Sequence, residues 1–335
     1  MRRTGLILIL GVAVLAALIL LSVLYGTTSI PAADALSAIA TGLGLSSADP
    51  TPMGRIVFDL RFPRALFSAI IGAGLGIVGV VLQTTTRNDL ADPFLFGLSS
   101  GAAAGAVFVI TITGDVLGIW TLPIAAFVGG MIASGIVLLL VQRLRTSAPE
   151  KLILSGLAVS FLFSAVTNYL IFSGDNRAAH SVIFWMLGGL GLSRWASLPL
   201  VLSALLMIFF YAFYRRRWFD ALLAGDLTAT SLGVPVHRLR VMSFMVSALA
   251  TAAFVSVAGV IGFVGLMVPH LARGIVGPLH GLLVPTAALV GAILLTASDI
   301  LSRLLLAPQE LPVGIVTTSL GAAFVFVLLL GSRQR

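Results

Sequence analysis

The chain has 335 residues, of which 59% are hydrophobic and only 10% are charged, and this composition excludes an ordinary soluble domain. It contains no cysteine, which excludes disulfides, thiol catalysis and thiolate metal sites. The formal net charge is +8, but the basic residues are divided among loops on both sides of the apolar stretches, which excludes a single nucleic-acid-binding patch.

Ten stretches are apolar enough to predict membrane-spanning helices, each of which needs about 20 mostly apolar residues. They are residues 5–25, 63–83, 93–113, 118–141, 151–172, 195–213, 241–259, 261–276, 282–300 and 312–331. The first follows Arg2 and Arg3 as in a signal peptide, but it lacks a small-residue cleavage site, so we interpret it as a span. The sequence therefore predicts an all-α, polytopic membrane protein with about ten transmembrane helices in a single domain, residues 1–335.

Two segments outside the spans are predicted to hold short helices. Residues 31–43, within the long connection 26–62, have apolar residues at helical spacing and are expected to lie along the surface. Residues 182–190 are apolar but too short to cross a membrane, which favours a re-entrant or interfacial helix. A simple surface loop is the alternative for this second segment.

Glycines recur about one helical turn apart within two of the predicted spans. The two stripes are Gly72, Gly76 and Gly79, and Gly97, Gly101 and Gly105. Small residues at this spacing allow membrane helices to approach closely. The pattern fits packing within one bundle or at a dimer seam, and the sequence leaves both open.

Two polar segments interrupt the spans on the side that we assign to the cytoplasm. The first, residues 84–93, ends in Asp92 and Pro93, a capping carboxylate followed by a proline suited to a first helical turn. In the second, residues 215–240, Asp226 is expected to cap a short helix that ends at Gly233-Val-Pro235. A short helix outside the spans would serve as a docking element for a partner, and a solvated connector is the alternative.

The distribution of charge predicts the orientation of the chain. If the N-terminus is cytoplasmic and ten spans follow, fourteen of the twenty basic residues lie inside and six lie outside. The external six are Arg55, Arg61, Arg64, Arg177, Arg194 and Arg303. This asymmetry follows the positive-inside rule and predicts an even number of spans with both termini in the cytoplasm.

Several functional signals are missing from the sequence. The only lysine is Lys151, so the chain has no phosphate-binding loop of the G-x-x-x-x-G-K-[ST] type. The spans hold few ionisable groups, apart from Asp299 and Arg303, which can pair on one helix face. This scarcity weighs against an ion-coupled secondary transporter, which remains the main rival interpretation, and against a membrane-embedded enzyme. The four histidines do not show the pairing typical of metal sites, so no metal is predicted.

Motifs across residues 55–331 resemble the FecCD-type permeases of ATP-driven importers for iron chelates, haem and vitamin B12. They are Arg61-Phe-Pro-Arg64, Gln83, Arg87-Asn-Asp-Leu-Ala-Asp-Pro93, Gly97-Leu-Ser-Ser-Gly101, Phe184-Trp-Met-Leu-Gly188, Ser231-Leu-Gly-Val234, Gly262-Phe-Val-Gly-Leu-Met-Val-Pro-His-Leu-Ala-Arg273 and Glu310-Leu-Pro-Val-Gly314. The chain departs from the family at Asp89, where a proline is usual.

The resemblance implies a type II ABC importer permease fold and a division of labour between subunits. It implies a homodimer in the bacterial inner membrane, two copies of a cytoplasmic ATPase that binds ATP and Mg, and a periplasmic substrate-binding protein. The chain itself would then be no enzyme and would hold no cofactor. Within the family, the cargo can be a siderophore, haem, vitamin B12 or an oxyanion such as molybdate. A lone external His180 does not decide among them.

The resemblance also implies roles for residues of this chain. The ATPase is expected to dock on the coupling helices at Gly225, Asp226, Thr228, Ser231, Leu232 and Gly233. The binding protein is expected to form ion pairs with Arg61, Arg64 and Arg303, for which contact with lipid headgroups is the alternative. The cytoplasmic gate is expected at Asn88, Leu90, Thr146 and Ser147. Residues 155–172 and 178–190 are expected to form a moving wall of a weakly lined pathway.

Overall fold

A computed structural model describes residues 2–26, 30–45, 51–143, 149–174 and 176–331, and within these ranges the regular structure is entirely helical. Eight helical segments are long and apolar enough to cross a membrane. They contain α1 (Arg2–Leu24), α4 (Phe62–Thr86), α6 (Thr121–Arg143), α7 (Pro149–Ser173), α9 (Leu198–Tyr214), α12 (Val236–Ala258), α14 (His280–Leu304) and α15 (Val313–Gly331).

Two shorter apolar helices occupy the other two predicted spans. The first is α5 (Leu98–Phe108), which continues as a π-helical turn, η3 (Val109–Thr113), and the second is α13 (Val264–Val276). The all-α, polytopic fold predicted from the sequence is therefore confirmed. The figure of ten spans is approximate, because only eight of the ten helices reach full spanning length.

Short helices lie between these segments, at both ends of the molecule. They are α2 (Ala32–Gly42), α3 (Pro52–Arg55), η1 (Ile56–Arg61), η2 (Pro93–Phe96), η4 (Gly118–Trp120), α8 (Asn176–Met186), η5 (Trp195–Ser197), α10 (Arg216–Leu223) and α11 (Asp226–Ser231). The predicted surface helix at 31–43 corresponds to α2, and the apolar piece at 182–190 belongs to the helix α8 and the turn after it. The loop alternative for that piece is wrong over the residues of α8.

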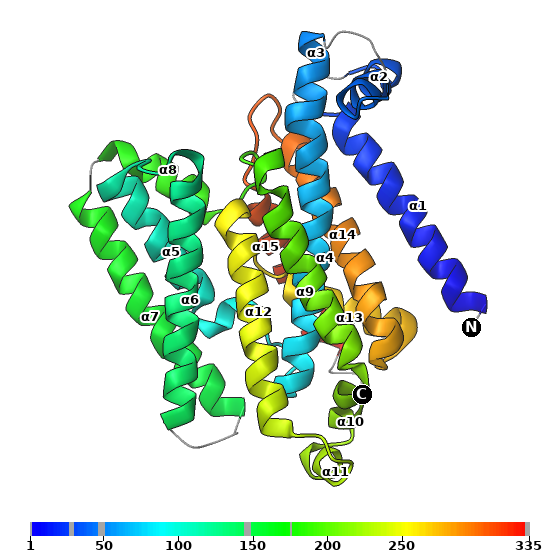
Figure 1. The fold of residues 1–335 in the computed structure, drawn as a ribbon, viewed down its shortest axis with the longest axis vertical. Helices are drawn as coiled ribbons and strands as arrows, with labels where there is room; N and C mark the ends of the chain where they lie inside the picture. The colour runs from blue at the N-terminus through cyan, green and yellow to red at the C-terminus, as the bar shows by residue number, and fades with distance from the viewer. Residues whose placement is uncertain (1, 27–29, 46–50, 144–148, 175, 332–335) are drawn as a thin grey trace.

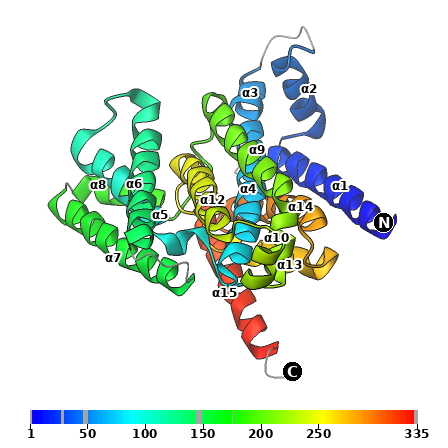
Figure 2. The ribbon, with the colours of Figure 1, turned by 60° about the horizontal axis from the view of Figure 1, so that its bottom comes forward.

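The helices form a central group and a side group. In the central group α4 is largely buried and contacts α14, α13, α9 and α12. The side group contains α5, α6, α7 and α8 and joins the centre mainly where α12 packs against α6 (Figures 1 and 2). Because α4 contacts most helices of the central group, a shift of α4 would displace several of them at once.

Both glycine stripes serve contacts within the chain. A Cβ on Gly72 would meet the backbone of Gly291 in α14, and a Cβ on Gly101 would meet the backbone of Gly129 in α6. Without side chains at these points, the helix backbones approach more closely than other residues would allow. The structure therefore resolves the open alternative for these two contacts in favour of packing within one bundle.

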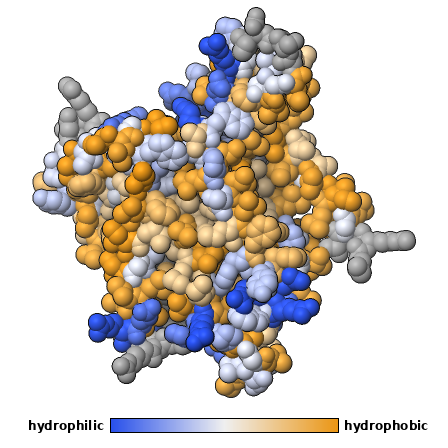
Figure 3. All heavy atoms as spheres, viewed as in Figure 1, coloured by the Kyte–Doolittle hydropathy of each residue, from blue (hydrophilic) through white to orange (hydrophobic). Residues whose placement is uncertain are grey.

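A broad apolar surface separates two more polar ends of the molecule (Figure 3). One end carries α2 and α3, and we call it the α2 end; the other carries α10 and α11, and we call it the α11 end (Figure 1). The start of α1 and the end of α15 both point towards the α11 end (Figures 1 and 2). An apolar band between polar ends is the expected surface of a protein immersed in a bilayer.

Candidate docking, gating and arginine sites

The short helix α11 projects from its end of the molecule and offers a contact surface (Figure 1). Of the residues predicted to dock the ATPase, Thr228, Ser231, Leu232 and Gly233 are exposed, while Gly225 and Asp226 are half-buried. The most exposed apolar side chain on the helix is Leu227, at 87%, followed at its C-terminal end by Leu232, at 68%. The two leucines form a small apolar surface outside the apolar band, which a partner could cover.

The sequence interpretation missed Leu227, although a signal was present. Leu227 stands directly after Asp226 in the first turn of a short helix, Asp226–Ser231, in which all other residues except Ala229 are polar. Its exposure follows from the helix register, because the same turn buries Ala229 against the chain. One face of α11 is thus fixed to the protein and the other is free to meet a partner.

The prediction that Asp226 caps α11 is wrong. Gly225 takes the N-cap position with φ at 101°, a conformation that favours glycine, and no side chain caps the helix. The Asp226 carboxylate instead forms an ion pair with Arg240 in α12, at 2.9 Å. The nearby guanidinium offers a charged partner, which is stronger than a backbone N–H donor.

The basic residues that open segment 215–240 stack on aromatic rings. The guanidinium of Arg215 lies 4.0 Å from the centre of the Trp218 ring, and that of Arg216 lies 4.3 Å from the Phe213 ring. These cation–π contacts hold the charged groups at the junction of α9 and α10. Such an arrangement suits a helix end at a membrane surface, where the hydrocarbon part of the arginine side chain contacts apolar groups and the guanidinium contacts water.

The predicted gate loop, residues 87–91, follows directly on the end of α4. Arg87 adopts a left-handed conformation with φ at 52°, which ends the helix. The Asn88 side chain accepts a hydrogen bond from the Leu90 backbone at 2.9 Å, so the loop is a compact turn. Leu90 is 55% exposed. Thr146 and Ser147, the predicted second half of the gate, lie outside the described residues.

Asp92 follows the predicted gate loop and starts the next helical turn, and this helical start was expected from the sequence. Its Oδ1 accepts a hydrogen bond from the Phe94 backbone at 2.9 Å, with Pro93 in the first position of η2. The other carboxylate oxygen is buried and has no hydrogen-bond partner among the described residues. Burial raises the pKa of Asp92 to about 6, against the lowering effect of the Phe94 N–H.

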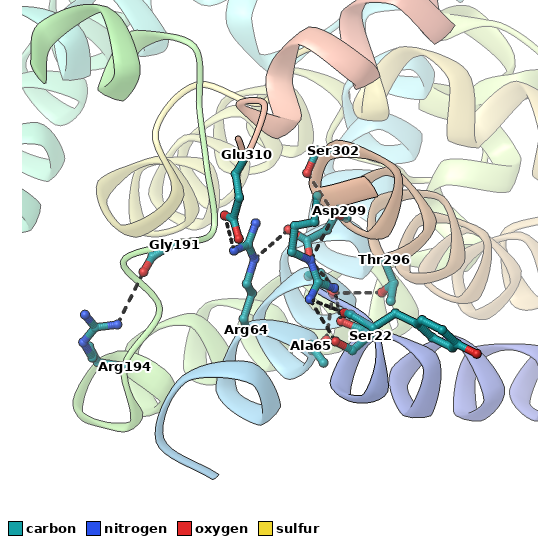
Figure 4. A network of polar contacts seen from close by, with 12 residues as sticks. Ser22, Arg64, Ala65, Gly191, Arg194, Thr296, Asp299, Ser302 and Glu310 are labelled. Atoms are coloured by element: carbon teal, nitrogen blue, oxygen red, sulfur yellow. Dashed lines mark hydrogen bonds and ion pairs between the residues drawn. The ribbon is translucent and has the colours of Figure 1, made fainter. Parts of the chain in front are cut away.

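The three arginines predicted to dock the binding protein lie together at the α2 end, with two carboxylates. We call Arg61, Arg64, Asp299, Arg303 and Glu310 the arginine cluster. Asp299 is fully buried, and only 2% of Arg303 and 8% of Arg61 is exposed. Figure 4 shows Arg64 between Asp299 and Glu310. The cluster joins α1, η1, α4 and α14 with the segment before α15.

Arg61 and Arg303 bind the C-terminal end of α1. Arg61 donates hydrogen bonds to the carbonyl oxygens of Val23 and Leu24, and Arg303 donates to those of Ser22 and Tyr25, all between 2.9 and 3.1 Å. The last carbonyls of a helix lack partners within the helix and carry partial negative charge, so guanidinium groups are suited to them. In this conformation both side chains face α1 and are withdrawn from an external partner, so their predicted docking role requires their release.

Arg64 and Asp299 complete the cluster. Arg64 donates to Asp299 at 2.9 Å and to Glu310 at 2.7 Å. The predicted pairing of Asp299 with Arg303 on one helix face is confirmed at 3.1 Å. That contact is an ion pair without hydrogen-bond geometry. Glu310 is the member whose side chain reaches the surface, at 40% exposure.

Two other arginines at the α2 end are exposed in the described residues, namely Arg55 and Arg194. Arg194 holds its guanidinium near the carbonyl of Ser193, at 3.1 Å, which leaves the group at the surface. These residues present positive charge that an acidic partner can reach without opening the arginine cluster.

A cavity of about 660 Å³ lies at the junction of the side group and the central group. It is lined in part by η3, α8 and the end of α12, and its lining includes Phe184 and Trp185. Asp115 and Ser181 supply polar groups to a lining that is otherwise mostly apolar. Within the described residues, no three His, Cys, Asp or Glu side chains come close enough to hold a metal ion.

Comparisons with known proteins agree with this architecture. Residues 14–331 match the model of the FecCD transport family. The chain is 42% identical to the cobalamin import system permease protein BtuC of Halobacterium salinarum, over 83% of this chain and 74% of that protein. It is 36% identical to the hemin transport system permease protein HmuU of Yersinia pestis, over 84% of this chain and 85% of that protein.

A solved structure has the same fold over nearly the whole length. It is an inward-facing conformation of an ABC transporter assigned to the metal-chelate type, with a TM-score of 0.84 and 30% identity. The match covers 98% of this chain and 99% of the other. Such complete coverage indicates that both chains are built as the same kind of membrane subunit.

Proposed function

Because the chain belongs to the FecCD transport family, and is thus a multi-pass permease subunit of an ABC importer, we propose that it forms half of the pathway for a bulky metal chelate. Its cargo is an iron–siderophore complex or haem, and vitamin B12 or an oxyanion such as molybdate is the alternative cargo for the same machinery. The cargo class is supported by the relatives named for cobalamin and hemin transport and by the metal-chelate type of the solved structure.

The exposed apolar face of α11 is the observation that carries the proposal. The chain has no phosphate-binding loop, so the ATP that drives an ABC importer would be hydrolysed by another subunit. Leu227 and Leu232 project from a short helix beyond the apolar band, where a water-soluble partner can reach them. We propose that an ATPase subunit, which binds ATP and Mg, covers this face in each of two copies of the chain.

The same proposal sets the orientation. The α11 end faces the cytoplasm of a bacterial inner membrane, and both termini lie on that side. The bias of basic residues towards the loops of this end supports this orientation. The two copies form a homodimer with the pathway between them, and membrane lipid surrounds the remaining apolar surface.

The α2 end then faces a substrate-binding protein. Arg64 remains our proposed docking residue in the arginine cluster, since its partner Glu310 reaches the surface. Arg61 and Arg303 are proposed to contribute only when α1 moves away from them. The exposed Arg55 and Arg194 add positive charge that would steer an acidic partner, since exposed ion pairs affect association rates more than affinity.

The lining of the large cavity supports transient contact with cargo. It is mostly apolar, with few groups that could hold a chelate by hydrogen bonds. A pathway that bound its cargo tightly would release it slowly, because residence time grows with affinity. We propose that this cavity, beside α8, is part of a weakly lined path.

Reconstitution of the transporter tests the proposal. The chain, its ATPase and its binding protein are placed in liposomes, and uptake of a ferric siderophore, haemin or cyanocobalamin is measured with ATP on the ATPase side. We expect uptake of at least one probe to require ATP and to persist with a protonophore. Uptake without ATP that collapses with the protonophore would identify an ion-coupled secondary transporter instead.

A further inference from the structure

Arg240 connects the docking helix α11 with the end of α4. It lies in the second turn of α12, and its side chain is 12% exposed. Its Nε donates to the Thr85 carbonyl oxygen at 2.9 Å, and its Nη2 binds the Asp226 carboxylate at 2.9 Å. One guanidinium therefore holds two elements that are far apart in the sequence, and its planar fork fixes their relative position.

The contact on α4 lies immediately before the gate loop. Thr85 is the last but one residue of α4, and its carbonyl is among those left without a partner by the end of the helix. The loop begins two residues later at Arg87 and is folded on itself through Asn88 and Leu90. A compact loop on a helix end moves with that end, so a displacement at Thr85 reaches Leu90.

A second connection joins α10 to the same turn of α4 through the buried ring of His280. The Asp220 carboxylate accepts hydrogen bonds from the His280 backbone at 2.8 Å and pairs with its Nδ1 at 2.7 Å. The other ring nitrogen lies 2.8 Å from the Thr84 hydroxyl. With Nδ1 as the donor to the carboxylate, Nε2 accepts from Thr84. Both short helices of the docking segment are thus attached to adjacent residues of α4.

The gate loop is also held from its other side by an exposed ion pair. Arg273 in the last turn of α13 binds Asp89 at 3.0 Å, and the Asp89 side chain is 79% exposed. An exposed pair of this kind contributes little and is screened by salt. It restrains the loop through α13 and not through Arg240, which makes it a natural internal control.

We infer that Arg240 is a positioning residue through which the docking of an ATPase at α11 acts on the gate loop. The inference rests on the proposed function, and it names the atoms that carry the motion: the Asp226 carboxylate, the Arg240 guanidinium and the Thr85 carbonyl. When the partner moves α11, Arg240 draws the end of α4 with it and shifts Leu90. The Asp220–His280–Thr84 connection keeps α10 and α4 together, so α10, α11 and the end of α4 move as one rigid body.

The absence of cysteine from the chain allows a direct test. Leu90→Cys places a single thiol in the exposed part of the gate loop, and its rate of reaction with a water-soluble maleimide reports access. The rate is compared with and without ATP in the reconstituted complex of the chain and its ATPase. Arg240→Lys is then added, which keeps a positive charge near Asp226 but removes the fork that also reaches Thr85.

We expect Arg240→Lys to leave ATPase co-purification and ATP hydrolysis unchanged, while it lowers the ATP-dependent change in labelling by roughly fivefold or more. The matched control, Asp89→Asn, should raise the labelling rate without ATP and keep the ATP-dependent change. Arg240→Gln should have the same effect as Arg240→Lys, which shows that the fork and not the charge matters.

The outcomes separate this inference from the proposed function. An unchanged ATP response in Arg240→Lys would overturn the role of Arg240. A loss of the response in Asp89→Asn would overturn it as well, because any disturbance of the loop would then suffice. If the chain with Arg240 intact neither binds the ATPase nor responds to ATP, the proposed function itself fails.

Discussion

The two ends of the molecule use the same chemistry, arginine with carboxylate, in opposite surroundings. At the α2 end, Asp299 and Arg303 are buried and the arginines also satisfy carbonyl groups of α1. At the α11 end, Asp226 and Asp89 are 40% and 79% exposed at the side chain. The first arrangement locks helices together, whereas the second leaves its carboxylates within reach of water and partners.

The difference shows that ion pairs of similar length have different roles. A buried pair is expensive to break, because the remaining charge stays in a medium of low polarity. An exposed pair is easily exchanged for water or for another charge. The α2 end is therefore suited to fixing α1 against the bundle. At the α11 end, the pair of Arg273 with the exposed Asp89 is the weaker contact, whereas Arg240 is only 12% exposed and holds its partners more firmly.

The largest expected effect is at the α2 end. Arg303→Gln should lower the free energy of unfolding by about 3 kcal/mol or more, because it removes the donors to the Ser22 and Tyr25 carbonyls and leaves Arg64 as the remaining partner of the buried Asp299. Thermal unfolding in detergent measures this loss. Arg194→Gln, at an exposed position of the same end, is the control and should be almost neutral. Equal stability of the two variants would contradict the contrast between the ends.

Asp92, a buried carboxylate at the α11 end without an ion-pair partner among the described residues, should have the opposite effect: its replacement should raise stability. The folded chain holds the Asp92 proton more tightly than the unfolded chain, since its pKa rises from 3.8 to about 6. The contribution of this group to stability is therefore greatest below about pH 4, falls as the pH rises towards about 6 and stays low above it.

Asp92→Asn should stabilise the chain at neutral pH by up to about 3 kcal/mol, because the amide is neutral at every pH and still accepts from Phe94. Unfolding measured at about pH 4 and about pH 7 checks this, since the advantage should disappear at the lower value. A variant that is less stable than the parent at neutral pH but not at about pH 4 would show that the charge of Asp92 has a partner.

The exposed face of α11 should matter for association and not for folding. Leu227→Ala is expected to weaken ATPase binding by about 2 kcal/mol, because we propose this leucine as an anchor of the interface. The affinity is measured with the purified subunits in detergent. Leu223→Ala on the neighbouring α10, where the side chain is 47% exposed, is the matched control. Equal effects of the two substitutions would exclude Leu227 as an anchor.

The smallest effect is expected at Asp89. Asp89→Asn should change stability by no more than about 1 kcal/mol, and the change should vanish at high salt, since the pair with Arg273 is exposed. Thermal unfolding across a salt series measures it. A large effect that persists at high salt would make this ion pair resemble the arginine cluster and would remove the difference between the two ends.

Much of the architecture could be predicted from local patterns. Apolar runs predicted the membrane helices, and α2, α8 and α11 all lie where short helices were expected. Asp92 before Pro93 predicted a helical start, and the spacing of Asp299 and Arg303 predicted their pairing. Each of these depends on residues within a few positions of one another, so the sequence alone determines them.

The tertiary structure decided which groups the charged side chains contact. Arg61 and Arg303 were expected to contact an external partner. They are instead buried against the end of α1, more than thirty residues from the first and some 280 from the second. Asp226 stands where the sequence predicts a capping residue, but it binds Arg240, fourteen positions away. No local sequence pattern predicts the hydrogen bond between Thr84 and His280, which are 196 positions apart. Hydrogen bonds and charges act over a few ångströms in space, and only the packing of the helices brings such partners within that range.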